Sequence, residues 1–381
     1  MKSPDSLRVA TGRGPFSRIV GQPRATGALG RSLASDRLCP SLIFHGPPQV
    51  GKLATALELA RALLCTAPRA ERPCGDCRAC RRIDESALLH PDVRVVFPET
   101  VGDFEKGEQT DQATGGLDLQ GTQSEAAGNP VWVILMERLR RSIAFLQRRP
   151  SEGALAILII DQAHRMEATA ANALLKTLEE PPPHACVLLL TSSYYALLPT
   201  LRSRCQAFPF QLVPTPAITD LLVTHRGLDP QEAALRAGLS GGRIGAALDL
   251  DLEQFRRRRE TLLALLEEIL TRGDPGLAVA RAEAIVRGGE GAEADLEILM
   301  TLLRDLLVLQ ASPGGAARLV NLDLAGRLLG LTSRIKGGGP AAVEDLEATI
   351  DAIRRKGNRQ LLVENFLMSL LPSAISARSP A

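Results

Sequence analysis

Aromatic side chains make up only 3% of the 381 residues. Modules that bind single-stranded nucleic acid stack bases on rows of aromatics, so a module of that kind is not expected. The formal net charge is only +2, from 45 Lys and Arg against 43 Asp and Glu. This balance excludes a globally basic coat for nucleic acid, although it permits a local basic surface. No apolar run approaches the ~18 residues of a membrane-spanning helix, so no membrane contact is expected.

The first fifteen residues lack the apolar stretch of a secretory leader, so the sequence predicts a cytoplasmic location. In a reducing compartment, clustered cysteines indicate a metal more often than disulfides. Cys65, Cys74, Cys77 and Cys80 follow the spacing C-x8-C-x2-C-x2-C. Four thiolates suit tetrahedral zinc, and such a closed site predicts a structural Zn²⁺. A redox pair is the alternative interpretation.

The chain is expected to begin with a flexible tail, residues 1–15, followed by an α/β domain over 16–213. Short apolar runs separated by helical segments predict a parallel sheet with flanking helices. The predicted strands lie at 42–44, 93–97, 155–160 and 187–190, and a predicted helix lies at 54–64. The cysteines fall in an insert, 65–82, and the aperiodic segment 99–130 is expected to be a mobile loop. Beyond residue 214, leucines at helical spacing predict an all-α remainder.

A phosphate-binding loop is predicted directly after the first strand. The segment Gly46-Pro47-Pro48-Gln49-Val50-Gly51-Lys52-Leu53 fits G-x-x-x-x-G-K between a strand and a helix. Gly46 and Gly51 would let backbone N–H groups face a phosphate, and Lys52 would contact the terminal phosphates. The next position normally carries the hydroxyl that binds Mg²⁺, but here it is Leu53. A glycine-rich turn with no ligand is the alternative.

A second acidic site is predicted where the strand at 155–160 ends. Asp161 stands where an aspartate would hold the water shell of the metal. The alternative is a cap for the helix expected from Met166, and Asp161 could serve both roles. The next residue should be a glutamate that polarises the attacking water, and Gln162 cannot accept a proton. Leu53 and Gln162 together argue against catalytic turnover.

Five further motifs accompany the P-loop and the four-cysteine insert. They are Ile19-Val20-Gly21-Gln22, His90-Pro91-Asp92, Asp161-Gln162-Ala163-His164, the run 171–182 and Ser203-Arg204-Cys205. In this order the motifs resemble those of the delta-prime subunits of the bacterial DNA polymerase III clamp loader. The resemblance covers residues 16–215 and is weaker in the helical remainder.

The resemblance implies a P-loop AAA+ core (a parallel sheet with flanking helices), a small helical lid over 214–255 and an all-α collar over 256–381 through which subunits assemble. It implies that Arg204 is an arginine finger that acts in trans on a neighbouring subunit's ATP site. Thr191 would lie in the sensor 1 region, and Val20 beside the adenine pocket. The implied partners are the gamma/tau and delta subunits, with the sliding clamp, DNA polymerase III and primer-template DNA reached through the complex.

Three hypotheses follow for function. The first is a stator-like subunit of the clamp loader, which binds ATP weakly or not at all, has no ATPase activity of its own and donates Arg204. The second is an active gamma/tau-type motor. It is disfavoured because Leu53, Gln162 and Gly245 stand where a hydroxyl, a glutamate and the sensor 2 arginine are expected. The third is a zinc-dependent module that binds nucleic acid and carries a vestigial P-loop.

Overall fold

The computed structural model describes eight stretches of the chain. They are residues 15–68, 72–83, 89–100, 132–287, 291–311, 319–332, 339–354 and 358–371. These residues form two compact units, 1–248 and 249–381, which are treated separately below. The predicted tail up to residue 14 and the predicted loop from residue 101 lie outside the described residues. Among the described helices, none is long and apolar enough to cross a membrane.

The first unit alternates strands and helices, as predicted. Its strands are β1 (Ser41–His45), β2 (Val93–Val96), β3 (Glu99–Thr100), β4 (Trp132–Val133), β5 (Ala156–Ile160), β6 (Ala185–Thr191) and β7 (Gln206–Pro209). Its helices are α1 (Pro23–Ala34), α2 (Lys52–Leu64), α3 (Arg78–Arg82), α5 (Met136–Gln147), α6 (Ala168–Glu179), α7 (Pro199–Arg202), α8 (Thr215–Arg226), α9 (Pro230–Leu239) and α10 (Ile244–Asp249). Short 3-10 turns lie at Ala163–Arg165 and Tyr194–Ala196.

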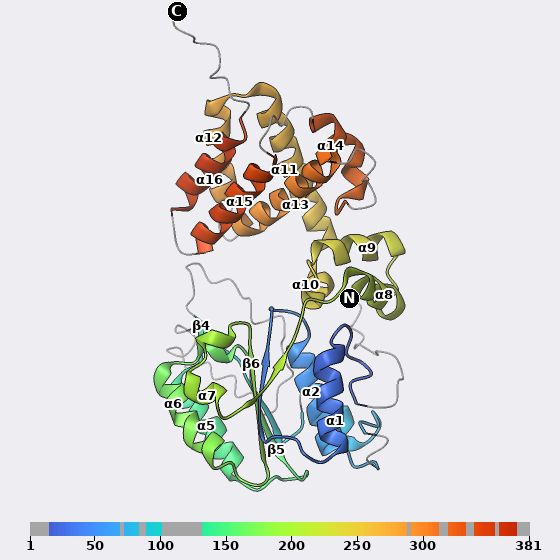
Figure 1. The fold of residues 1–381 in the computed structure, drawn as a ribbon, viewed down its shortest axis with the longest axis vertical. Coiled ribbons are helices and arrows are strands. Elements are labelled where there is room, and N and C mark those ends of the chain that lie inside the picture. Colours follow the sequence, from blue (N-terminus) through green and yellow to red (C-terminus); the bar gives the residue numbers. More distant parts are fainter. Residues whose placement is uncertain are drawn as a thin grey trace, which may run out of the picture. The chain divides into compact units, whose positions relative to one another are not determined.

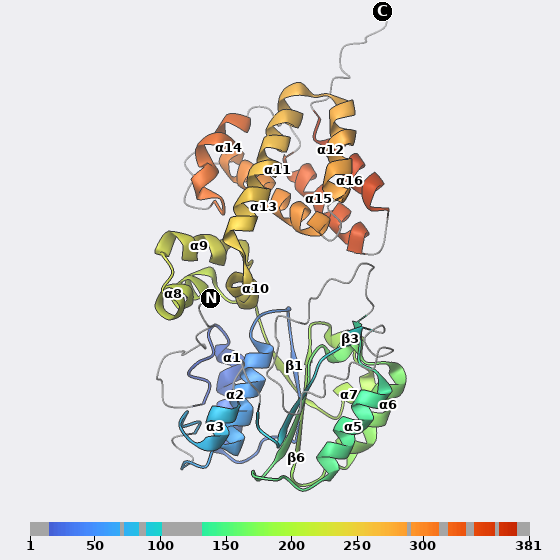
Figure 2. The same cartoon turned by 180° about the vertical axis from the view of Figure 1, so that it is seen from behind.

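Five strands form one parallel sheet in the order β2-β5-β6-β1-β7. Figures 1 and 2 show helices on both of its faces, with α1 and α2 on one side and α5 and α6 on the other. The side chains of successive residues in each strand point to opposite faces of the sheet. Phe44 belongs to the core under α1 and α2, whereas its neighbour Ile43 belongs to the core under α5 and α6. Both faces are buried, which explains the continuous apolar runs of the sequence.

Two details depart from the expected pattern. The segment expected to be a mobile loop begins in a strand, because Glu99 pairs with Val133 and Thr100 with Trp132 in an antiparallel ladder. The edge strand β7 was not predicted; only Phe208 of its four residues is buried, so it has no continuous apolar run.

Helices α8, α9 and α10 pack around a small apolar core of their own at the end of the first unit. Ile218, Leu222, Ala233, Ala237 and Ala247 form its centre. Proline opens both α8 and α9 within their first turn, and the Asp229 carboxylate caps α9. These helices fall within the range 214–255, for which a lid stays a prediction, and residues 249–255 of that range belong to the second unit.

The second unit is helical throughout its described residues. Its helices are α11 (Leu252–Arg272), α12 (Pro275–Arg287), α13 (Gly291–Ala311), α14 (Ala325–Leu331), α15 (Gly339–Arg354) and α16 (Arg359–Ser369), with a 3-10 turn at Leu322–Leu324. The leucine face of α13 is buried within this unit, so its apolar side chains meet the unit's own core. The members of that face are Leu299, Leu302, Leu303, Leu306 and Leu309.

The arginine run at 256–259 is not the fully solvated helix start that its charge indicates. Arg259 is buried and donates to Asn321 at 3.1 Å and to both carboxylate oxygens of Asp323. Asn321 in turn donates through its backbone N–H (2.7 Å) and its side-chain amide (2.9 Å) to the fully buried Asp305. This network joins α11, α13 and the turn after residue 319, and it satisfies charges that would be costly to bury unpaired.

Asp92 fixes the loop that leads into β5. Its buried carboxylate accepts backbone N–H groups from Ser151, Glu152 (2.8 Å) and Gly153 (2.7 Å). Burial opposes ionisation of this side chain, but the three N–H donors outweigh burial and lower the pKa of Asp92 below its ordinary value.

We predict that Asp92→Asn lowers the free energy of unfolding at pH 7 by about 2–3 kcal/mol. The amide keeps one acceptor oxygen but turns an N–H₂ group toward backbone N–H donors. Because the folded-state pKa is depressed, this stabilisation is present above the unfolded pKa of ~3.9 and is lost as the pH falls below it. Urea titrations at pH 7 and pH 3 should therefore show the difference from wild type shrinking at pH 3.

Asp229→Asn is the matched control, because asparagine caps a helix about as well as aspartate and should change stability by less than ~0.5 kcal/mol. An equal loss in the two variants would contradict the role given to Asp92.

Candidate nucleotide and metal sites

The predicted nucleotide residues lie at the edge of the sheet where the central strands end. His45 pairs with Thr191, and Ile160 pairs with Leu189, so these three strands end at nearly the same level. The P-loop follows β1 and Asp161 follows β5. Parallel strands therefore bring Gly46, Asp161 and Thr191 to one edge, which is where ligands bind in open α/β sheets.

The P-loop has the backbone of a phosphate loop. Gln49 has φ 58° and Gly51 has φ 94°, so this short segment turns through the left-handed region. Gly46 has φ 145°, and a Cβ there would lie 2.1 Å from the Phe210 carbonyl oxygen. Close packing against the segment that follows β7 thus requires glycine at position 46 whether or not a phosphate binds.

Lys52 contacts its own loop. Its ammonium donates to the Gly46 carbonyl at 2.8 Å and also to the Pro47 carbonyl. Burial lowers the pKa of Lys52 to about 8, although the Asp161 carboxylate opposes this shift. Burial raises the pKa of Asp161 in turn, against the hydrogen bond from the Gln162 N–H and the charge of Lys52. The two predicted residues therefore share one partly desolvated environment.

The position that normally supplies a magnesium-binding hydroxyl belongs to the apolar core here. Leu53 is partly buried and packs against the core beneath α1 and α2. The nearby hydroxyl of Thr55 donates to the Gly51 carbonyl at 2.8 Å and is fully buried. Neither side chain is placed to replace the missing ligand.

Asp161 does not cap a helix, so that alternative was wrong. Helix α6 begins at Ala168 and has Glu167 at its N-cap position. The Asp161 carboxylate instead accepts the N–H of Gln162 at 2.9 Å, and Gln162 itself adopts the left-handed conformation with φ 48°.

Thr191 joins the P-loop to the segment after Asp161. Its carbonyl accepts the Gly46 N–H at 3.2 Å, and its hydroxyl lies 3.1 Å from Nδ1 of His164. Burial lowers the pKa of His164, and the charges of Arg165 and Lys52 act in the same direction. The sequence motif that contains His164 does not predict this contact, because an isolated histidine carries no signal of its own.

Gln22 is a further residue of this region, and its role could not be predicted from the motif that contains it. Its buried side chain donates to the carbonyls of Val50 (3.2 Å) and Gln211 (2.6 Å) and accepts the Gln211 N–H (3.1 Å). It thereby ties the P-loop to the segment that leads into α8. Val20, two residues earlier, packs against the core of α8–α10.

Gly245 lies directly against the P-loop. Its N–H donates to the Gln49 carbonyl at 2.9 Å, and a Cβ at this position would lie 3.0 Å from the Cβ of Gln49. A long side chain at residue 245 would need the P-loop or α10 to shift.

Arg204 lies at the opposite edge of the sheet from the P-loop. It lies two residues before the start of β7, and Gln206 pairs with Leu42 near the start of β1. The strand rise from the level of Leu42 to that of Gly46 is about 13 Å, and Arg204 lies further still from the level of Gly46.

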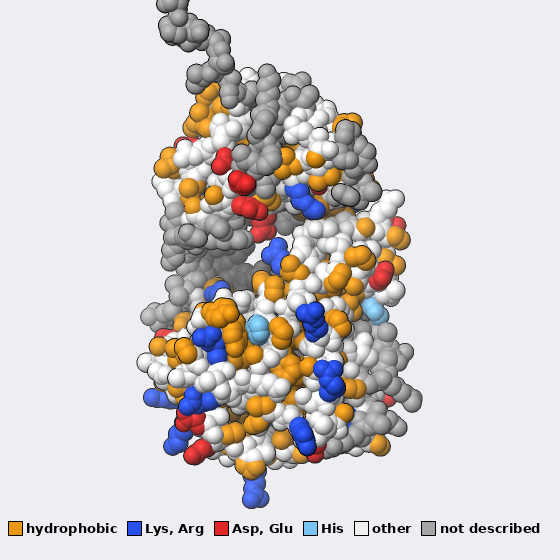
Figure 3. Space-filling view, in the orientation of Figure 1, with side chains coloured by type: hydrophobic (Ala, Val, Ile, Leu, Met, Phe, Trp, Pro, Cys, Tyr) orange, Lys and Arg blue, Asp and Glu red, His pale blue; other side chains and the backbone are white. Residues whose placement is uncertain are grey.

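On the face shown in Figure 3, Lys and Arg side chains of the first unit lie mostly singly among apolar and uncharged ones.

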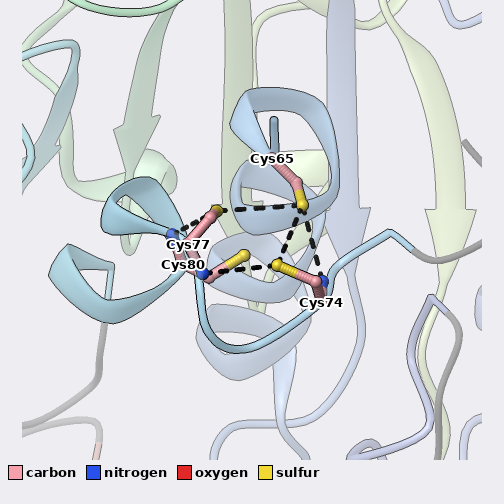
Figure 4. A group of neighbouring side chains, drawn as sticks. All are labelled: Cys65, Cys74, Cys77 and Cys80. Atoms are coloured by element: carbon pink, nitrogen blue, oxygen red, sulfur yellow. Dashed lines mark hydrogen bonds between the residues drawn. The ribbon is translucent and has the colours of Figure 1, made fainter. Parts of the chain in front are cut away.

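The four predicted metal ligands come together. Cys65 follows α2, Cys74 lies in the connecting loop, and Cys77 and Cys80 belong to the start of α3 (Figure 4). All four sulfur atoms lie within 4.8 Å of one another. The separation is 3.5 Å between Cys65 and Cys74 and 3.9 Å between Cys65 and Cys77. A tetrahedral ion with metal–sulfur bonds of ~2.3 Å requires about 3.8 Å, so the cluster fits such an ion.

Backbone N–H groups point at the sulfur atoms of this cluster. Those of Ala67 and Cys74 lie 3.4 Å from the Cys65 sulfur, and that of Cys77 lies 3.3 Å from the Cys74 sulfur. Burial disfavours the Cys77 thiolate, but hydrogen bonds led by the Cys80 N–H outweigh burial and lower the pKa of Cys77 to about 6. Such donors offset the negative charge that four thiolates concentrate around one ion.

The sheet order, the P-loop after β1, the aspartate after β5 and the helical α8–α10 part define a P-loop core of the AAA+ class. A family model described as DNA polymerase III, delta subunit, matches residues 21–214. The DNA polymerase III subunit delta' of Bacillus subtilis is 30% identical over 80% of this chain and 82% of its own length. That of Escherichia coli is 31% identical over 87% of this chain and 88% of its own length. The chain therefore belongs to the DNA polymerase III subunit delta' family.

The similarity extends to a second type of subunit. The DNA polymerase III subunit gamma/tau of Mycobacterium bovis is 28% identical over 96% of this chain, which spans 62% of that relative.

Proposed function

We propose that this protein is a clamp-loader subunit of DNA polymerase III that hydrolyses little or no ATP itself and donates Arg204 to the ATP site of a neighbouring subunit. The observation that supports this most is the separation of Arg204 from its own P-loop by the length of the sheet. A guanidinium at that edge cannot contact a phosphate held by Gly51 and Lys52 of the same chain. It can act only on a nucleotide that another subunit presents.

The surroundings of the P-loop support an inactive site. Leu53 packs into the core, Lys52 binds loop carbonyls, and Gly245 closes against Gln49. Gln162 cannot act as the base for an attacking water. Gly51 and Lys52 retain the shape for a phosphate, so weak ATP binding is compatible with this proposal.

The proposed partners follow from the named relatives, which are delta' and gamma/tau subunits. In this proposal the chain assembles with gamma/tau and delta subunits in the cytoplasm, and the complex loads the sliding clamp onto primed DNA for DNA polymerase III. The second unit would supply the collar through which the subunits assemble.

A gamma/tau-type motor is the second candidate, favoured by the similarity to a gamma/tau subunit over 96% of the chain. It requires the chain to hydrolyse ATP, which the residues at positions 53, 162 and 245 disfavour.

We further propose that the four cysteines hold one structural Zn²⁺, with Cys65, Cys74, Cys77 and Cys80 as ligands. The ion would join the end of α2 to α3. Four protein ligands leave no open position for substrate, so its contribution would be to stability.

Replacing Arg204 by alanine should leave assembly intact but slow ATP hydrolysis at the site that faces it by at least ~10-fold, because an arginine finger stabilises the transition-state charge. A single-turnover assay on the complex reconstituted with gamma/tau and delta subunits measures this rate. Arg204→Lys should recover only part of it, since lysine lacks the fork of donors.

Arg226→Ala is the control, because Arg226 is exposed on α8 and away from the proposed contact. An unchanged rate in the Arg204→Ala complex would remove the finger assignment.

Freshly purified full-length chain should contain one zinc ion per molecule by elemental analysis. Cys77→Ser should reduce that content and lower the melting temperature, whereas Cys39→Ser, outside the cluster, should leave the zinc content unchanged. Chelation should destabilise the wild-type chain toward the melting temperature of Cys77→Ser. Absence of zinc from freshly prepared protein would contradict the four-cysteine assignment.

A further inference from the structure

Arg204 is held by a carboxylate from a different element. Its Nη2 lies 2.6 Å from Oε1 of Glu179, the last residue of α6, and its Nη1 donates to the Thr200 carbonyl at 3.0 Å. Ser203 Oγ lies 3.4 Å from the same Nη1. Two acceptors from separate segments therefore fix the two terminal nitrogens of one guanidinium.

The ion pair between Arg204 and Glu179 contributes little to the stability of the fold. The side chains of Arg204 and Glu179 are 35% and 48% exposed, and exposed pairs of this kind contribute little to folding. Glu179 also stands at the carboxyl end of a helix, where the helix dipole disfavours a negative charge, and Glu180 follows it directly. The position is thus locally unfavourable for a carboxylate unless a cation lies nearby.

The ion pair restricts the conformation of the Arg204 side chain. A free arginine samples many rotamers, and ordering it during catalysis raises the barrier. The bonds to Glu179 and Thr200 restrict the guanidinium to one orientation before a nucleotide arrives. A guanidinium has five N–H donors, so the bonds to these two acceptors leave donors of the fork able to bind phosphate oxygens.

We propose that Glu179 is a positioning residue for Arg204: it holds the guanidinium in the orientation that reaches the nucleotide of the neighbouring subunit. This inference rests on the proposed function of Arg204 and adds a residue from α6 to that site. Glu179 acts through Arg204 alone and does not itself contact the nucleotide.

The test uses the reconstituted complex and single-turnover ATP hydrolysis. Glu179→Ala should lower the rate about 3- to 10-fold, the cost of ordering one flexible side chain, with little change in the ATP concentration for half-saturation. Glu179→Gln keeps an acceptor for Nη2 without the charge, so its rate should lie between those of wild type and Glu179→Ala. In the Arg204→Ala background, Glu179→Ala should cause no further loss.

Glu232→Ala is the matched control, because Glu232 forms a comparable 2.8 Å ion pair with Arg236 on α9, and it should hydrolyse at the wild-type rate. The inference is overturned if Glu179→Ala is as fast as wild type or faster, or if it causes the same fractional loss without Arg204. If the Arg204→Ala complex itself hydrolyses ATP at the wild-type rate, the proposed role of Arg204 is wrong. This outcome differs from the one that overturns the role of Glu179, so the two hypotheses are tested separately.

Discussion

The parallel pairing of β1 with β6 on one side and β7 on the other determines what this protein can do. In a parallel sheet all carboxyl ends share one edge. The P-loop, Asp161 and Thr191 therefore gather at one edge, and the segment before β7, with Arg204, lies at the other. In the proposed function, the P-loop of one subunit and Arg204 of another therefore meet only where two neighbouring subunits come together.

At the edge of the sheet that carries the P-loop, polar groups of the protein form hydrogen bonds with one another. Lys52 binds loop carbonyls, the Thr55 hydroxyl binds the Gly51 carbonyl, and Gly245 binds Gln49. A nucleotide would have to displace the first of these contacts to be held by the ammonium. The Arg204 edge has the opposite character, because Glu179 and Thr200 orient a side chain that remains partly exposed. The polar groups near the P-loop thus bind one another, whereas at the other edge two contacts hold a partly exposed guanidinium in one orientation.

Much of this arrangement could be predicted from the sequence. The buried strands appear as apolar runs, the P-loop as a glycine spacing, and the cysteines as a ligand spacing, since each pattern is local. The edge strand β7 escaped prediction because only one of its faces is buried. Contacts between distant segments could not be predicted either. Gln22 bonds to Gln211, and Glu179 bonds to Arg204, and no periodicity in the sequence indicates these pairs. The burial of Arg259 within a run of four arginines depends on Asp305 and Asp323, far along the chain.

In the proposed function, this chain keeps the backbone of a P-loop but lacks the side chains that hydrolyse ATP. Steady-state ATP hydrolysis by the purified full-length chain with Mg²⁺, with and without primed DNA, tests this directly. We expect no turnover above background in either condition. Robust hydrolysis stimulated by DNA would contradict this expectation and would favour a motor subunit.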